Sequence, residues 1–566
     1  MKLFCALALL AVLARAEAEL QVLAYKSTSE YPDASDFPEV ELLKNKPNTA
    51  IGFSGGGSRA YTAAIGYLAG LHELDLIKNV RYIGGISGGS WATTAFTFTQ
   101  NVTDDEVLLG KIEMPEDITK EKLQQMDPAC ARSLPSPELT LIALQALIDG
   151  EVKTLAEGWA YAVSKIYLEP LGILPNQRFS WDAASVADII ERNPQLAGEL
   201  FTVPLAPDRP FPILGTTLVG PSEGAPYGSA TQNFSFMEMT PLYIGHMKSL
   251  DVEYSYHTQR GAVHSLHVGG AIEPFAFSRG GSPAPQQGLP LSAATGILAV
   301  PEPDTFLDLQ FVAGASSYAP GAFFASVKLP DLARTLSLDM GYWSPSNPLP
   351  QSATMMYTDG GCYENIPLIS FIQRRVAKIV LFYSSSTPLL PFEDWDVSTD
   401  TFDGSQITDD LAAFFGVFAE AGSMPNWENR SFEIEKNQVF PTADWVPVVT
   451  AMQKAQQAGK GIFASFNLTT VENSWWGVPA GLTFDVTFGY LGRLSQWEDK
   501  LSRGMQELVV PDTTDLSVDI KHGPFRSFPH YATKGGGVNA EQANLLADLT
   551  GWSVLQHEDL FRRVLS

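Results

Sequence analysis

Two short apolar runs, each ending in a glycine-rich turn, lie close together in the N-terminal part of the chain. The first run, TAIGF from Thr49, leads through three consecutive glycines into a segment with helical spacing. The second, VRYIGGIS from Val80, leads through another glycine-rich turn into a second such segment from Ser90. This repeated order of strand, turn and helix is typical of a parallel sheet covered by helices. We therefore predict an α/β fold with a mostly parallel central sheet flanked by helices.

Further segments extend this pattern. The sequence SPELTLIALQALIDG from Ser136 has the cap, the proline and the final glycine of a helix. Additional strands are expected at FPILGTTLV, LQFVAGAS, AKIVLFYSS and LTFDVTFGYL, which begin at Phe211, Leu309, Ala377 and Leu482.

The domain organisation follows from the length of the chain and from the lack of a clear linker. With 566 residues and 45% hydrophobic side chains, the chain can bury a large core. No stretch divides it cleanly. We expect an irregular lead-in over 19–48 and a single catalytic domain over 49–566, with insertions at about 104–300.

The first residues have the features of a secretory signal. Lys2 precedes an apolar run, and small residues follow at Ala14, Ala16 and Ala18. The run is too short to span a bilayer. We expect a signal peptide over 1–18, no transmembrane segment, and a location that is secreted or in the endomembrane lumen, including the lysosome or vacuole. Asn-X-Ser/Thr triplets agree with this compartment and predict glycosylation at Asn101, Asn233, Asn429 and Asn467.

Charge and cysteine content argue against other classes of protein. The formal net charge of −26 argues against nucleic-acid binding and against a polybasic membrane-binding role. Outside the signal, only Cys130 and Cys362 remain, too few for a disulfide framework. They either pair with each other or stay as two buried thiols. No cluster of histidines or cysteines indicates a catalytic metal, and no cofactor is expected.

The three consecutive glycines have three possible interpretations. A phosphate-binding P-loop needs Gly-Lys-Ser/Thr after its spacer, and none follows here. A dinucleotide site is matched by Gly55, Gly57 and Ala60, but the next strand ends in glycines and a serine instead of the required carboxylate. The third interpretation is an oxyanion hole, in which bare main-chain N–H groups bind a developing negative charge.

The sequence GISGG, which begins at Gly85, favours the oxyanion hole. It matches the G-x-S-x-G turn that exposes a nucleophilic serine between a strand and a helix. Because neighbouring parallel strands end at the same edge of a sheet, Ser87 should face the glycine loop. We predict that Ser87 is the nucleophile and that the N–H groups of Gly56 and Gly57 form the oxyanion hole.

A serine nucleophile needs a base, and the sequence offers two candidates. The apolar stretch that ends in MMYTDGG places Asp359 at the end of a strand, followed by glycines. Alternatively, His522 or His530 lies late enough in the chain for the Ser-Asp-His order of an α/β-hydrolase triad. Asp-Gly pairs also stabilise turns, which is the structural alternative for Asp359.

Three motifs occur together in this chain: SGGGSRA from Ser54, GISGGSW from Gly85 and DGGCYENIPL from Asp359. They resemble the signatures of the cytosolic phospholipase A2 and fungal phospholipase B (lysophospholipase) family, to which patatin-like lipases are more distantly related. EMTPLYIG from Glu238 and AGASS from Ala313 resemble further stretches of this family. The matches are scattered from about residue 52 to about residue 370. The resemblance implies a patatin-like serine hydrolase core.

The resemblance also implies a Ser-Asp dyad that works without histidine. Ser87 would be the nucleophile, and Asp359 would be its base and would later activate the water that cleaves the acyl-enzyme. Gly55 would join Gly56 and Gly57 in the oxyanion hole. Arg59 would help to hold the substrate phosphate; the structural alternative is an arginine paired with an acidic neighbour. The family often has an aromatic residue where this chain has Ser58. We find no calcium-dependent membrane-binding module before the first strand, so calcium is expected to be dispensable.

We therefore expect a secreted or lumenal, calcium-independent phospholipase or lysophospholipase. Its substrate would be a phospholipid or lysophospholipid, met transiently at a membrane or micelle surface. The insertions at about 104–300 would supply the lid and the acyl-chain pocket. Two alternatives stay open: a Ser-His-Asp carboxylesterase acting on other esters, and a non-enzymatic lipid-binding or storage protein.

Overall fold

The computed structural model describes most of the chain after residue 18. The described residues are 19–27, 30–125, 127–222, 234–255, 263–279, 291–320, 336–347, 353–419, 434–532 and 537–566. The expected signal peptide over 1–18 and two of the expected glycosylation sites, Asn233 and Asn429, lie outside these residues.

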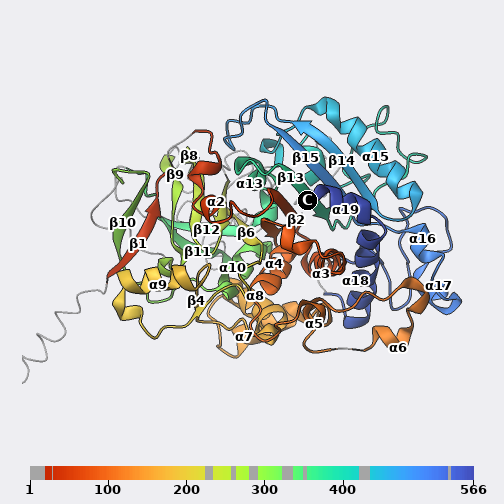
Figure 1. Cartoon of the computed structure of the whole chain (residues 1–566), viewed down its shortest axis with the longest axis horizontal. Helices are drawn as coiled ribbons and strands as arrows, with labels where there is room; N and C mark the ends of the chain where they lie inside the picture. The colour runs from red at the N-terminus through yellow and green to blue at the C-terminus, as the bar shows by residue number, and fades with distance from the viewer. Residues whose placement is uncertain are drawn as a thin grey trace, which may run out of the picture.

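Five parallel strands form the centre of one large sheet (Figure 1). Their order is β6–β3–β2–β13–β15, and each neighbouring pair is parallel. Every residue of β2 and β3 is buried, as expected for strands covered on both faces. The predicted α/β fold with a parallel sheet centre is confirmed. The five strands are β2 (Thr49–Phe53), β3 (Tyr82–Ile86), β6 (Phe211–Pro221), β13 (Lys378–Tyr383) and β15 (Thr483–Tyr490).

Antiparallel strands extend this sheet on both sides. β14 pairs with β15 at one edge, whereas β7, β8, β9, β1 and β10 follow β6 toward the other edge. β12 also pairs with β6 and carries β11, and β4 and β5 form a separate small sheet. The additional strands are β1 (Glu19–Tyr25), β4 (Arg178–Phe179), β5 (Phe201–Thr202), β7 (Ser235–Met239), β8 (Ile244–Ser255), β9 (Val263–Ile272), β10 (Thr295–Pro301), β11 (Leu338–Tyr342), β12 (Ala353–Asp359) and β14 (Ile462–Thr469).

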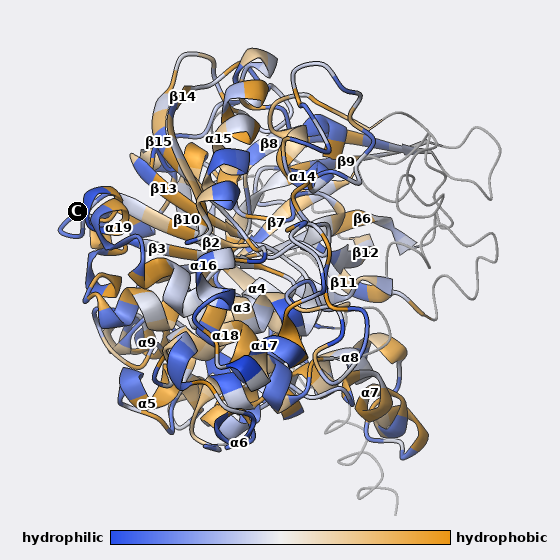
Figure 2. Ribbon diagram, turned by 90° about the vertical axis from the view of Figure 1, so that its right-hand side faces the viewer, coloured by the Kyte–Doolittle hydropathy of each residue, from blue (hydrophilic) through white to orange (hydrophobic). Residues whose placement is uncertain are grey.

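Helices cover both faces of the central strands. On one face, Tyr67 of α3 stacks on Phe382 of β13, and α4 and α18 lie beside α3 (Figure 1). On the other face, Phe371 of α13 packs over Gly52 of β2. Figure 2 shows hydrophobic colours concentrated in the central strands, while the outer helices alternate between hydrophobic and hydrophilic residues.

The helices fall into two groups along the chain, one before β12 and one after it. The first group is α2 (Glu39–Leu42), α3 (Gly57–Glu73), α4 (Gly88–Phe98), α5 (Asp105–Leu109), α6 (Lys120–Leu123), α7 (Leu139–Ile148), α8 (Leu155–Val163), α9 (Ala183–Arg192) and α10 (Leu309–Ser317). The second is α13 (Leu368–Gln373), α14 (Asp409–Ala413), α15 (Trp445–Ala458), α16 (Ser495–Glu498), α17 (Arg503–Val509), α18 (Ala540–Leu555) and α19 (Glu558–Val564). The helix predicted from Ser136 is present as α7. Within the described residues, no helix is both long enough and apolar enough to cross a membrane.

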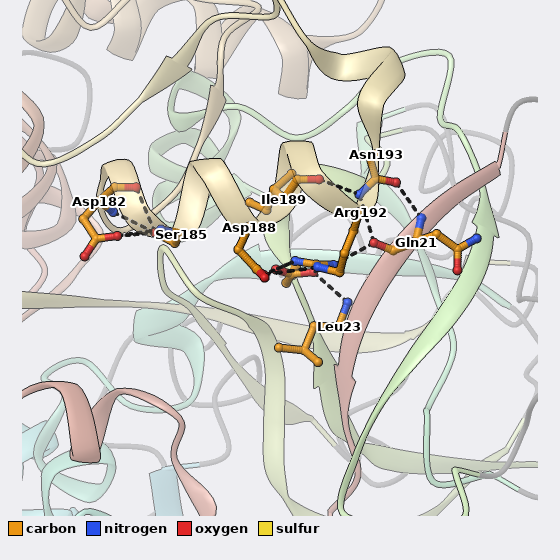
Figure 3. Close-up of polar contacts among 9 residues, drawn as sticks. Gln21, Leu23, Asp182, Ser185, Asp188, Ile189, Arg192 and Asn193 are labelled. Carbon is orange, nitrogen blue, oxygen red and sulfur yellow. Dashed lines mark hydrogen bonds and ion pairs between the residues drawn. The ribbon is translucent and has the colours of Figure 1, made fainter.

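Part of the lead-in over 19–48, which was expected to be irregular, forms the strand β1. β1 pairs antiparallel with β10 over its whole length, and its residues alternate between more buried and more exposed positions. Side chains near α9 hold β1 from one side (Figure 3). Arg192 donates to Gln21 O at 2.7 Å, and the N–H of Gln21 donates to the side chain of Asn193 at 2.7 Å. The strand partner β10 lies far along the chain from β1, so the local sequence around β1 does not reveal the pairing.

The segment 104–300 is not simply an insertion, which corrects a second expectation. Its helices α5 to α9 do lie outside the central strands (Figure 1). However, β6 belongs to the same segment and pairs in parallel with β3 at the centre of the sheet. The region therefore supplies part of the central sheet as well as part of its cover.

The segment LQFVAGAS is a helix and not the predicted strand. It forms α10, and Asp308 caps its start by accepting the N–H of Phe311 at 2.8 Å. All of its residues except Gln310 are buried. A short apolar run with no polar face has no periodicity that separates a buried strand from a buried helix.

Candidate active site

Strands β3 and β12, which both pair with β6, end close together and so bring the predicted nucleophile and base together. Ser87 follows β3, and Asp359 is the last residue of β12, which pairs with β6. Ser87 Oγ donates a hydrogen bond to Asp359 Oδ2 at 2.8 Å. The two residues retain 8% and 7% of their possible exposure, so the pair is buried but reaches the surface. This hydrogen bond has the geometry that a serine and its base require.

Ser87 occupies a strained turn. Its φ of 51° and ψ of −121° lie where residues with a side chain are rarely found. Its N–H donates to the main-chain oxygen of Ser316 at 3.2 Å and to Ser316 Oγ at 3.1 Å. Ser316, in α10, is a supporting residue that sequence reasoning missed, although it lies in the quoted AGASS stretch. Its two bonds hold the turn that exposes the Ser87 hydroxyl.

The glycine loop and the serine turn touch directly. A Cβ on Gly88 would lie 2.1 Å from the main-chain oxygen of Gly57, a distance that no side chain tolerates. The start of α4 can therefore approach the start of α3 only because residue 88 is glycine. This contact places the two loops at one sheet edge, as the order of the strands predicted.

Two of the three predicted oxyanion donors, the N–H groups of Gly56 and Gly57, have no acceptor among the described residues. Gly56 and Gly57 have φ values of 138° and 56°. They stand at the start of α3, where the helix dipole favours negative charge. The N–H of Gly55, in contrast, donates to the main-chain oxygen of Asn365 at 3.0 Å. Gly55 thus provides space beside Ser87 but not a free donor, which corrects its predicted role.

Asp359 is held by two donors, and no cation among the described residues forms an ion pair with it. In addition to Ser87, the N–H of Gly361 donates to Asp359 Oδ1 at 2.8 Å. Burial raises the pKa of Asp359 to about 6, and these two hydrogen bonds only partly oppose that effect. The carboxyl group is therefore ionised at neutral pH yet basic enough to accept a proton.

The two histidines of the alternative triad lie elsewhere. His530 is buried, and its Nδ1 contacts Asp519 Oδ1 at 2.7 Å while its Nε2 contacts the main-chain oxygen of Leu491 at 3.1 Å. His522 is exposed in a different segment. The structure pairs neither histidine with Ser87.

Arg59 is buried behind the glycine loop. Its Nε donates to the main-chain oxygen of Ser384 at 2.8 Å, and its Nη1 donates to the main-chain oxygen of Tyr531. These bonds fasten the first turn of α3 to two other segments. They fit a structural role for Arg59, through carbonyl groups and not through the acidic neighbour that sequence reasoning suggested.

The remaining predicted residues can be placed briefly. Cys130 and Cys362 are both buried and are not bonded to each other, so the alternative of two buried thiols holds. Of the glycosylation triplets within the described residues, Asn101 and Asn467 are both exposed. Their side chains are accessible to a modifying enzyme, and their modification stays a prediction.

Comparison with known proteins finds short segments of similarity. No family model matches the chain. One segment of 159 residues is 31% identical to cytosolic phospholipase A2 gamma of Mus musculus and covers 28% of this chain and 26% of that protein. Another, of 67 residues, is 49% identical to cytosolic phospholipase A2 zeta of Homo sapiens and covers 12% of this chain and 8% of that protein. The matched segments thus span about a quarter of the first relative and less of the second.

A solved structure of human GIVD cytosolic phospholipase A2 aligns with 92% of this chain and 62% of that chain. The aligned residues are 14% identical, and the TM-score is 0.44.

Proposed function

The chain is related to the cytosolic phospholipases A2, and from this premise we propose that it hydrolyses acyl esters of glycerophospholipids or lysophospholipids. The observation that carries the proposal is the 2.8 Å hydrogen bond from Ser87 Oγ to Asp359 Oδ2. It supports a Ser-Asp dyad because the carboxyl group lies where a base must lie, and the N–H groups of Gly56 and Gly57 are open beside it.

The proposed reaction has two halves. In the first, Ser87 Oγ attacks the acyl carbonyl carbon while its proton passes to Asp359 Oδ2. The negative charge that forms on the carbonyl oxygen is stabilised by Gly56 and Gly57 N–H. The ester bond then breaks, and Asp359 returns the proton to the leaving alcohol oxygen.

The second half regenerates the enzyme. A water molecule gives its proton to Asp359 as its oxygen attacks the acyl-serine carbonyl carbon. The same N–H groups stabilise the second oxyanion, the Ser87 ester bond breaks, and Asp359 returns the proton to Ser87 Oγ. The net products are a fatty acid and the deacylated alcohol, with no net gain or loss of protons by the enzyme.

The compartment and the metal requirement are part of the proposal. The signal-like residues 1–18 and the exposed positions of Asn101 and Asn467 support a secreted or lumenal, glycosylated protein. Charge stabilisation by main-chain N–H groups requires no calcium in the reaction. Catalysis should therefore persist in EDTA.

The test is fatty-acid release from phosphatidylcholine vesicles and lysophosphatidylcholine micelles with EDTA present. Wild type, Ser87→Ala and Asp359→Asn are compared, with circular dichroism spectra to check the fold of each. We expect release by wild type and loss of release in both variants. A folded wild type that releases nothing from either lipid would contradict the proposal and favour a lipid-binding protein. If Asp359→Asn kept its activity, the base would lie elsewhere.

A further inference from the structure

Asn365 lies between the loop that carries the proposed oxyanion hole and the loop that carries Asp359. Its main-chain oxygen accepts the N–H of Gly55 at 3.0 Å. Its side-chain Oδ1 lies 2.2 Å from the position that a Cβ on Gly55 would take, and 2.7 Å from the position of a Cβ on Gly361. The amide of Asn365 therefore fills the space beside both glycines and spans the two loops.

Asp410 holds that amide from its other end. Asn365 Nδ2 donates to Asp410 Oδ2 at 2.6 Å, and Thr408 Oγ1 donates to the same oxygen at 3.3 Å. An ionised carboxylate only accepts hydrogen bonds. An ionised Asp410 therefore requires Asn365 to direct its Nδ2 toward Asp410 and its Oδ1 toward the glycines.

We propose that Asp410 is a positioning residue for the Ser87–Asp359 pair and that it acts through Asn365. This inference rests on the proposed function. On one side, Asn365 meets Gly55, which lies beside Ser87. On the other side it meets Gly361, whose N–H donates to Asp359 Oδ1. An amide fixed by Asp410 thus sets the separation of the two loops that must bring Ser87 Oγ and Asp359 Oδ2 into contact.

The surroundings of Asp410 make its charge sensitive to pH near neutrality. Burial, followed by repulsion from Asp409, raises the pKa of Asp410 to about 7, and the charge of Asp359 adds to this effect. Other titratable groups also interact with Asp410: Cys362, Tyr383 and Tyr490. Burial raises the pKa of each of these three groups, so they are uncharged at neutral pH. In either protonation state, Asp410 keeps an oxygen that accepts a hydrogen bond from Asn365 Nδ2.

Two substitutions separate the hydrogen bond from the charge. Asp410→Leu removes the acceptor. Asp410→Asn keeps an acceptor oxygen for Asn365 Nδ2 but removes the charge. The pKa of Asp410, about 7, lies above that of Asp359, about 6, so Asp410 is mostly uncharged at the pH where Asp359 ionises. Asp410→Asn should therefore leave the acidic limb of the pH profile near pH 6.

The experiment measures kcat and KM for lysophosphatidylcholine micelles between pH 4 and 9, together with the rate at which a fluorophosphonate probe labels Ser87. For Asp410→Leu we expect kcat to fall by about 10- to 100-fold, with KM unchanged and slower labelling. Asp410→Asn should recover most of the wild-type kcat at pH 8. Asp409→Asn is the matched control, because it removes a neighbouring charge and leaves the bond between Asp410 and Asn365 intact.

A second variant keeps the test decisive if Asp410→Leu fails to fold. Asn365→Ala removes the amide itself and should also lower kcat at constant KM. Where the proteins fold, the double variant should be no slower than the slower single variant, since both changes break one connection.

Several results would overturn the inference. They are an unchanged kcat in folded Asp410→Leu or Asn365→Ala, an effect on KM alone, and an Asp410→Asn enzyme as slow as Asp410→Leu. Each would leave the proposed function intact as long as wild type hydrolyses lipid. A wild type inert to both the lipid and the probe would instead overturn the proposed function, and this inference with it.

Discussion

Two of the sites where this protein buries carboxylates hold them in different ways. Glu39 and Glu238 both bind the guanidinium of Arg374, each with a nitrogen–oxygen distance of 2.7 Å, and Arg374 is fully buried. In the candidate active site, Asp359 and Asp410 accept hydrogen bonds from N–H and O–H groups. Within the described part of the chain, neither of these two forms an ion pair with a cation.

The pKa values of the carboxyl groups differ between the Arg374 cluster and the candidate active site. Burial opposes ionisation of Glu238, but Arg374 and the hydrogen bonds of Glu238 hold its pKa below the usual value. Burial raises the pKa of Glu39, and the same guanidinium only partly opposes that effect. In the candidate active site, burial raises the pKa of Asp359 to about 6 and that of Asp410 to about 7. Glu238, which Arg374 contacts through two nitrogens, keeps its charge at neutral pH and serves structure. A buried carboxylate without a cation can exchange a proton near neutral pH, which is what a general base must do.

The largest expected effect comes from removing the proposed base. Asp359→Asn cannot accept the Ser87 proton, so kcat should fall by about 10²- to 10⁴-fold while the melting temperature does not decrease. Glu238→Gln is the matched change in the other region and should lower the melting temperature instead. Measuring kcat and thermal unfolding for both variants checks the contrast. If the Asp359→Asn enzyme kept nearly full activity, the contrast between a catalytic Asp359 and a structural Glu238 would be wrong.

Removing the cation of the structural region should cost stability. Arg374→Met leaves two buried carboxylates without their partner, and the free energy of unfolding should drop by about 3–5 kcal/mol. Chemical denaturation measures this change. The control is Arg503→Ala, which breaks an exposed pair with Glu507 and should leave the unfolding midpoint unchanged. Equal midpoints for the two variants would show that the buried pair is not important for stability.

The pH dependence of wild-type activity should reflect Asp359. Because its pKa in the folded protein is raised to about 6, the base is ionised above that pH and gains a proton below it. We expect kcat to be high at pH 8 and to decline as the pH falls through about 6. A pH–rate profile on a neutral ester would check this. Full activity down to pH 4 would assign the base to an unperturbed carboxyl group.

The smallest expected effect is that of the histidines. His522→Gln and His530→Gln should leave kcat unchanged, singly and together, because Ser87 has Asp359 as its hydrogen-bond partner. Thermal unfolding of each variant separates a loss of stability from a loss of chemistry, since His530 also contacts Asp519. Folded variants that are inactive would restore the Ser-His-Asp triad as the leading mechanism.

Some elements of this structure could be predicted from the sequence, and others could not. The serine turn and the glycine loop were predictable because each needs particular small residues within a few positions, as Gly88 illustrates. α10 was mistaken for a strand because its apolar run has no polar face, and its identity depends on the cap from Asp308. β1 was missed because its partner, β10, lies some 270 residues further along the chain.

The sequence by itself determined the two βα units, the positions of Ser87 and Asp359, and the local need for glycine between strand and helix. These properties follow from steric limits within a few residues. Only the tertiary structure decided that Asp359 and neither histidine meets Ser87, across 272 residues of sequence. It also decided that Gly55 is not a free donor and that Asp410 reaches the site through Asn365. Such contacts depend on how distant segments pack, and no local pattern records them.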